Sequence, residues 1–136
     1  MPGWSMPVLV DSHTHIDMRL YNRDRDQVLE RARGAGVAAV VDVGCDLDSS
    51  REAIRLAAQY SEVFAALGFH PHSAAKMRDS DLERLSELAQ HPKVVAIGEI
   101  GLDFYRNLGA QHTYRVGLWG RWGWWSERTF RSAPLL

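Results

Sequence analysis

Four short apolar runs, separated by stretches with the spacing of amphipathic helices, constrain the fold of this sequence more than any other feature. The runs begin near residues 8, 37, 63 and 94, so consecutive runs start 26 to 31 residues apart. That distance suits one strand followed by one helix and a return to the same sheet. The pattern predicts an α/β fold with a parallel sheet, which is either a barrel or an open doubly wound sheet.

Almost continuous apolar character, typical of strands buried on both faces, predicts the four strands. They cover residues 8–10, 37–43, 63–70 and 94–97. Apolar residues at helical spacing predict three helices between them. They lie in the segments 22–36, 51–61 and 82–90.

Polar residues and glycines mark the expected ends of these helices. Asp24 or Asp26 is expected to cap the first helix, and Gly36 follows its end. Ser80 and Glu83 have the spacing of a capping box at the start of the third helix.

Composition limits the class of protein. Hydrophobic residues make up 46% of the chain and charged residues 24%, as in ordinary globular domains. The net charge of −1 excludes a global positive field for binding polyanions. No apolar run approaches the roughly 18 residues of a membrane-spanning helix. With one cysteine, Cys45, and no signal-peptide pattern, the sequence predicts a cytoplasmic protein without an internal disulfide.

Two histidines at the end of the first strand are the strongest candidates for chemistry. Because side chains two apart in a strand share a face, His13 and His15 can converge on one metal ion. Glu99 ends the fourth strand and could bridge two such ions. Nitrogen and carboxylate ligands suit zinc or manganese better than calcium. Divalent ions at this edge would activate water for hydrolysis of a phosphoryl or carbonyl group.

Other polar residues near the strand ends have weaker signals. His70 and His72 follow the third strand, and we expect His70 to contact substrate. Asp11 and Asp17 flank the first histidines and are candidates to orient their rings, with turn-forming acids as the equal alternative. The remaining candidates are Asp103 and Tyr105, which could reach the site from a loop, and Cys45, expected to be an inert thiol.

Three motifs, DSHTHID, GFHPH and GEIGLDFY, resemble in order and spacing the TatD family of metal-dependent hydrolases in the amidohydrolase superfamily. The resemblance implies a TIM-type (β/α)8 barrel, two divalent ions (zinc, manganese or magnesium) and hydrolysis of phosphoesters as a 3′-5′ deoxyribonuclease. It implies metal ligation by His13, His15 and Glu99, with Glu99 also catalytic. Two later histidines and a late aspartate, which the resemblance also implies, have no counterpart here.

The resemblance covers about half of a barrel, residues 1–107, with four β/α units. Residues 108–136 form a basic, Trp-rich tail without a regular hydrophobic period, and we expect it to lie outside the family fold. A frameshifted reading of GC-rich DNA would explain its composition. Two alternative functions stay open: a non-catalytic fragment that binds at most one metal ion, and a hydrolase of a different ester or amide bond.

Overall fold

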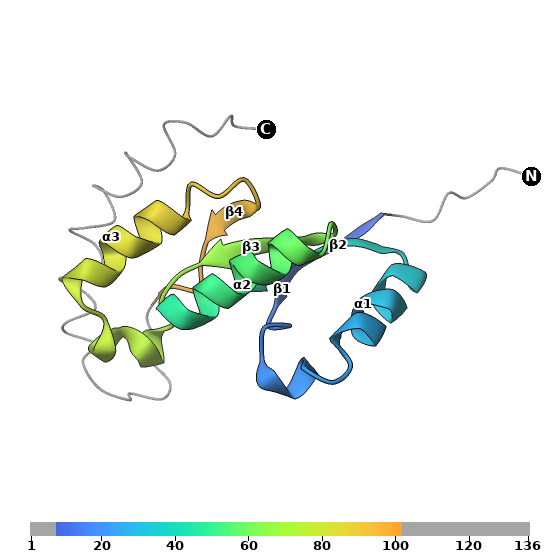
Figure 1. Ribbon diagram of the computed structural model, residues 1–136, viewed down its shortest axis with the longest axis horizontal. Coiled ribbons are helices and arrows are strands. Elements are labelled where there is room, and N and C mark those ends of the chain that lie inside the picture. Colours follow the sequence, from blue (N-terminus) through green and yellow to red (C-terminus); the bar gives the residue numbers. More distant parts are fainter. Residues whose placement is uncertain (1–7, 102–136) are drawn as a thin grey trace, which may run out of the picture.

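Strands and helices alternate along residues 8–101, the part of the chain that the computed structural model describes (Figure 1). The strands are β1 (Leu9–Thr14), β2 (Val37–Val43), β3 (Val63–Leu67) and β4 (Val94–Ile97). The helices are α1 (Arg25–Gly34), α2 (Leu47–Gln59) and α3 (Asp79–Leu88), with short 3-10 helices η1 (Arg19–Tyr21) and η2 (Pro71–Lys76).

The four strands form one parallel sheet in the order β1-β2-β3-β4. Each helical connection returns the chain to the neighbouring strand in the same direction, so the C-terminal ends of all four strands lie at one edge. The predicted succession of β/α units is confirmed. The bounds of β2 and β4 are the same as those of the apolar runs 37–43 and 94–97.

Two predicted helix starts are wrong. Helix α2 begins at Leu47, before the expected segment 51–61, because the carboxylate of Asp46 accepts a hydrogen bond of 2.8 Å from the backbone N–H of Ser49. Helix α3 begins at Asp79 instead of using the Ser80 and Glu83 pair. There the Asp81 carboxylate accepts the backbone N–H of Arg78 at 2.9 Å.

The beginning and end of α1 agree with the sequence. Asp24 occupies the N-cap position, although its side chain makes no capping hydrogen bond among the described residues, and the helix ends at Gly34. Gly36 then has a φ of 93°, a conformation that glycine adopts without steric cost. The chain can therefore turn directly from the helix into β2.

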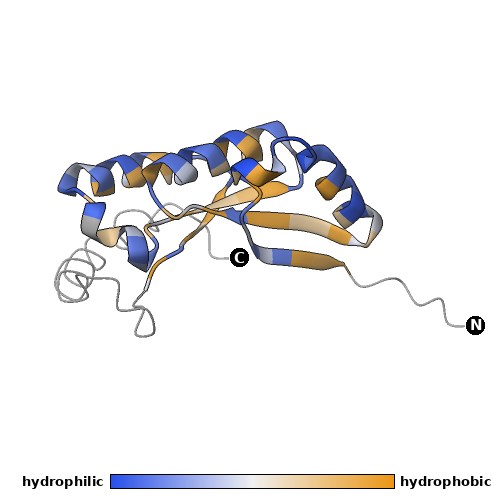
Figure 2. Ribbon diagram, turned by 90° about the horizontal axis from the view of Figure 1, so that it is seen from below, coloured by the Kyte–Doolittle hydropathy of each residue, from blue (hydrophilic) through white to orange (hydrophobic). Residues whose placement is uncertain are grey.

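The hydrophobic core lies between the sheet and the helices, which gather on one side of the sheet (Figure 2). Leu56 of α2 and Val63 and Leu67 of β3 are fully buried at its centre. Helix α2 connects β2 to β3 and packs against β3. This contact fixes the C-terminal ends of β2 and β3, where the polar motifs begin.

The expectation that the first strand is buried is wrong. Val8, Leu9 and Val10 are 77%, 47% and 59% exposed. Strand β1 is at the edge of the sheet, and among residues 8–101 its only strand partner is β2. A short apolar run in the sequence does not show whether its strand lies in the centre of a sheet or at its edge.

Several expectations fall on residues beyond the described range. The boundary near residue 107, the tail 108–136, and the loop candidates Asp103 and Tyr105 all lie outside residues 8–101. Within that range no helix has the length and apolar character needed to cross a membrane.

Candidate metal centre

The side chains of His13, His15 and Glu99 converge at the C-terminal edge of the sheet. The Nε2 atoms of the two histidines are 3.3 Å apart. Glu99 Oε2 lies 3.5 Å from His13 Nε2 and 3.7 Å from His15 Nε2. Residues separated by more than eighty positions in the sequence therefore meet at one point, as the parallel order of strands predicts.

The backbone explains this convergence. His13 is in β1 and His15 directly follows it, so the two-residue period of a strand directs both rings to the same face. Glu99 follows the end of β4, whose neighbour in the sheet is β3. Its backbone N–H donates to the carbonyl of Gly44, just after β2, at 3.0 Å. The carboxylate is thus held over the middle of the strand ends.

The hydrogen bond behind the His15 ring fixes which nitrogen carries the proton. His15 Nδ1 lies 2.9 Å from the carbonyl oxygen of Val43, which can only accept, so Nδ1 is the donor. In the neutral ring, Nε2 then presents a lone pair toward Glu99. This is the tautomer in which an imidazole can bind a metal ion through Nε2.

His70 has the opposite arrangement. Its Nδ1 accepts the backbone N–H of His72 at 3.1 Å, so the proton of the neutral ring is on Nε2. That nitrogen lies 3.4 Å from Glu99 Oε1. His70 therefore offers a hydrogen-bond donor at the side of the cluster, whereas His15 offers an acceptor within it.

The two acids that flank the first histidines do not orient their rings. Asp11 accepts the backbone N–H of His13 at 3.2 Å. Asp17 lies near His15 but hydrogen-bonds through its own backbone N–H, which donates to Asp42. Of the two roles left open for these acids, the described residues favour the turn or strand-end role, since the His15 Nδ1 donates to the Val43 carbonyl instead of a carboxylate.

A buried acid, Asp42 in β2, accepts the backbone N–H of Asp17 and belongs to none of the three motifs. It is fully buried, and one of its oxygens has no hydrogen-bond partner among the described residues. Burial, reinforced by the nearby charge of Asp17, raises the pKa of Asp42 to about 7. Burial also raises the pKa of Asp17. A single acid within the apolar run VAAVVDV was the available sequence signal.

The raised pKa of Asp42 predicts a pH-dependent stability. The folded state keeps this proton up to about pH 7, whereas the unfolded chain releases it near pH 4. Stability is therefore expected to fall by about 1 kcal/mol per pH unit between these values and to level off above them. Urea unfolding at pH 5, 6 and 8 measures this slope. The Asp42→Asn variant should lack it, and an equal slope in the variant would contradict the assignment.

Cys45 is closer to the cluster than its sequence context indicates. Its Sγ lies 3.9 Å from His15 Nδ1 and 4.0 Å from Glu99 Oε2. Burial, followed by the negative charge of Glu99, raises the pKa of the thiol to about 11. The group stays protonated at neutral pH and is a poor nucleophile, in agreement with the expectation of an inert thiol.

The donor set fits a divalent cation. One atom from each of His13, His15 and Glu99 can be chosen so that all three lie within 4.8 Å of one another. Two imidazole nitrogens and one carboxylate oxygen are ligands that zinc and manganese accept. The lone pairs of His15 and Glu99 face each other without a proton between them in the neutral tautomer, an arrangement that a cation would stabilise.

The absence of a side chain at Gly68 allows the segment after β4 to approach the end of β3. A Cβ at Gly68 would lie 2.6 Å from the carbonyl carbon of Gly98 and 2.7 Å from the backbone oxygen of Glu99. Gly68→Ala is therefore expected to destabilise the fold by about 1 to 3 kcal/mol and to displace Glu99. Gly34→Ala is the control, since nothing lies within 4 Å of its added Cβ. Equal unfolding midpoints for the two variants would contradict this prediction.

Comparisons with known proteins agree with the geometry. The sequence model of the family described as TatD related DNase matches residues 10–115. The chain is 40% identical over 98 residues to the uncharacterized metal-dependent hydrolase YabD of Bacillus subtilis. It is 39% identical over 99 residues to the 3′-5′ ssDNA/RNA exonuclease TatD of Escherichia coli. These matches cover 72% and 73% of this chain, which spans 38% of the length of each relative.

Solved structures show the same likeness. The crystal structure of YjjV, a TatD homologue from Escherichia coli, has a TM-score of 0.75 at 31% identity. The match covers 88% of this chain and 47% of the YjjV chain. A TatD family hydrolase from Entamoeba histolytica shares the fold with a TM-score of 0.69 at 24% identity, over 85% of this chain and 46% of that one.

Proposed function

Because the chain belongs to the family of TatD-related DNases and carries four parallel strands and the three α-helices between them from its TIM-type barrel, we propose that it contributes to metal-dependent hydrolysis of phosphodiester bonds in single-stranded DNA. The observation that carries this proposal is the convergence of two imidazoles and one carboxylate at the C-terminal edge of the sheet. Barrel enzymes place their active sites at this edge. The name of the Escherichia coli relative supports a substrate strand that is degraded from its 3′ end.

In this proposal His13, His15 and Glu99 hold the divalent ion. A bound ion would polarise a phosphoryl oxygen and make water more acidic. The Val43 carbonyl holds the His15 proton on Nδ1, which leaves Nε2 available as a ligand. The carboxylate of Glu99 reaches both histidines through Oε2 and leaves Oε1 toward His70, which suits a group shared between ligation and catalysis.

His70 contributes a substrate contact in the same proposal. Its Nε2 is the donor nitrogen of the neutral ring and faces the cluster at 3.4 Å from Glu99 Oε1. A phosphodiester oxygen beside Glu99 would accept this hydrogen bond. The donor character supports a role in substrate binding over metal ligation through the same nitrogen.

The direct test is incubation of the chain with 3′-labelled single-stranded DNA in Mn²⁺ or Mg²⁺. We expect release of the 3′ label, which stops when the metal is chelated. The His13→Ala/Glu99→Ala double variant should be inactive. His91→Ala is the matched control, because His91 lies at the opposite edge of the sheet, where its Nδ1 accepts the Lys93 N–H.

Two results would overturn the proposal. Label release that continues in the double variant would place the chemistry elsewhere. Binding of a single equivalent of zinc without any metal-dependent cleavage would instead support the non-catalytic alternative. That alternative rests on the described residues, which offer one three-ligand cluster.

A further inference from the structure

A pocket of about 230 Å³ lies next to the candidate metal centre, between η2 and the beginnings of α2 and α3. The same two loops form both sites. After β2, Cys45 contacts Glu99 and the following residue, Asp46, lines the pocket. After β3, His70 faces Glu99 while Ser73 lines the pocket. The backbone N–H of His70 donates to the Cys45 carbonyl at 2.9 Å, which holds the two loops together.

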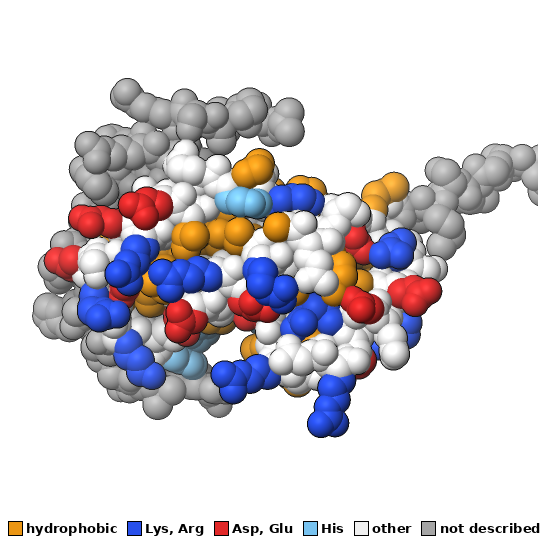
Figure 3. Space-filling view, in the orientation of Figure 1, with side chains coloured by type: hydrophobic (Ala, Val, Ile, Leu, Met, Phe, Trp, Pro, Cys, Tyr) orange, Lys and Arg blue, Asp and Glu red, His pale blue; other side chains and the backbone are white. Residues whose placement is uncertain are grey.

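Charged side chains from three elements surround this pocket. Figure 3 shows Lys and Arg side chains gathered over η2 and the beginnings of α2 and α3. The cations that line the pocket are Arg51, Lys76, Arg78 and Arg84, and the acids are Asp46, Asp48 and Asp81.

Each of the three acids already has an intramolecular partner. Asp46 caps α2 by accepting from the backbone and the hydroxyl of Ser49, at 2.8 and 2.7 Å. Asp81 is 4% exposed and accepts the backbone N–H of Arg78 at 2.9 Å. Asp48 forms a 3.4 Å ion pair with Arg51 on the surface of α2. The acids therefore serve the helix ends and the neighbouring arginines.

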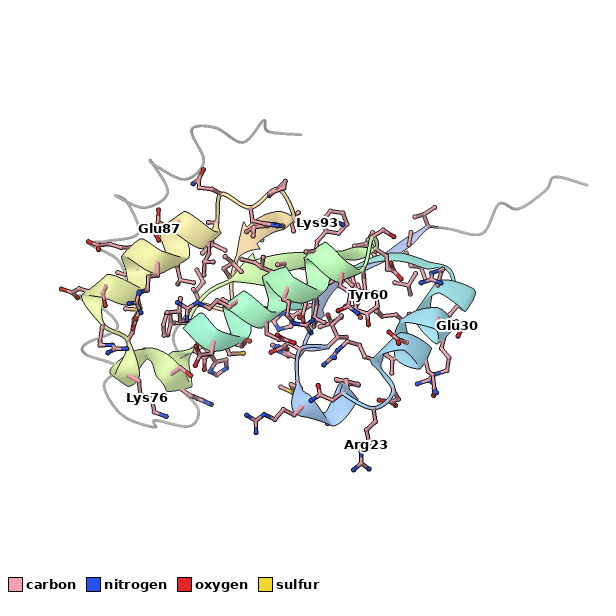
Figure 4. All side chains as sticks on the ribbon, in the orientation of Figure 1. Arg23, Glu30, Tyr60, Lys76, Glu87 and Lys93 are labelled. Carbon is pink, nitrogen blue, oxygen red and sulfur yellow. The ribbon has the colours of Figure 1, made fainter. Side chains whose placement is uncertain are left out.

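Two of the cations remain unpaired. Within residues 8–101, neither Lys76 nor Arg84 forms an ion pair or a side-chain hydrogen bond. Both are exposed, and Figure 4 shows the Lys76 side chain extending outward from η2. The pocket thus has a local excess of positive charge although the whole chain has a net charge of −1.

The helices add to this charge. Both α2 and α3 direct their N-terminal ends toward the pocket, as the lining residues from their first turns indicate. Helix N-termini carry partial positive charge and favour anions. Two cationic side chains without an acidic partner in the described range, together with two helix ends beside the candidate metal centre, match the chemistry of a phosphate group.

We propose that this pocket binds a backbone phosphate of the substrate strand, beyond the bond that is cleaved. The inference rests on the proposed function. It adds that the preferred substrate is an oligonucleotide, since a single nucleotide ester has no second phosphate to place in this pocket. A linear polyanion that enters at the strand ends passes the adjoining loops, where Lys76 and Arg84 neutralise one further charge.

The test is binding of a fluorescent oligothymidylate to the 136-residue chain in chelator, measured by anisotropy at several salt concentrations. The Lys76→Ala/Arg84→Ala variant should bind roughly 5- to 10-fold more weakly, and its salt slope should decrease by about 0.7, the value for one phosphate contact on a single strand. Arg31→Ala is the control, because Arg31 is an exposed cation in the last turn of α1, away from the strand ends.

Unchanged oligonucleotide affinity in the double variant would overturn the inference, as would an equal loss in the control. Calorimetric binding of inorganic phosphate with no effect of the variant on oligonucleotide affinity would assign the pocket to a free anion instead. Because the assay contains no divalent metal, its failure is separate from a failure of hydrolysis. Cleavage of the small diester bis(p-nitrophenyl) phosphate should be equal in wild type and variant, since it lacks the second phosphate.

Discussion

Replacing His15 by alanine is expected to lower the affinity of the chain for Zn²⁺ roughly 100-fold or more. Loss of a partner that merely orients a metal ligand costs 10- to 100-fold, so loss of the ligand itself should cost at least as much. His15 is the best-held member of the cluster, since its ring is fixed by the 2.9 Å contact with the Val43 carbonyl. Titration calorimetry at constant pH measures the change.

The matched control for this variant is His91→Ala. Both changes remove one imidazole, but His91 lies between α3 and the N-terminal end of β4, at the edge of the sheet opposite to the cluster. We expect its zinc affinity to equal that of the wild type. If both histidine variants bind zinc as tightly as the wild type does, the cluster does not ligate the metal.

Leu56→Ala is expected to destabilise the fold by about 2 to 5 kcal/mol. Leu56 is fully buried in α2, where it packs within the core formed with β3 and the other helices. Truncation loses the transfer free energy of the side chain and leaves a cavity that the surrounding helices fill only in part. A domain has a total stability of only about 5 to 15 kcal/mol, so this single change removes a large share.

Urea unfolding followed by circular dichroism measures this loss. Leu20→Ala is the control, because Leu20 in η1 is 67% exposed. Its expected cost is within about 0.5 kcal/mol. A loss below about 1 kcal/mol for Leu56→Ala would contradict the packing of α2 on the sheet.

The order of elements could be predicted from the sequence because each β/α unit carries its own signal. The run 37–43 is apolar throughout, and it became β2 with the same bounds. The meeting of His13 and Glu99 also followed from sequence, since parallel strands end at the same edge. This part of the site depends on topology, which periodicity reveals.

Other features leave no recognisable pattern in the sequence. The Val43 carbonyl sets the proton position of His15, but a backbone oxygen leaves no residue signature. The early start of α2 depends on Asp46 and Ser49, whose reciprocal hydrogen bonds reverse the usual residue types of a capping box. The exposure of β1 depends on what lies beside it in space, which an apolar run does not encode.

Zinc-edge anomalous diffraction from crystals of the zinc-loaded chain would locate the bound ion. We expect a zinc peak at about 2.0 to 2.1 Å from Nε2 of His13 and His15 and at about 2.0 to 2.2 Å from the Glu99 carboxylate. Zinc bound elsewhere, with no peak among these three side chains, would contradict the assignment of this cluster as the metal centre.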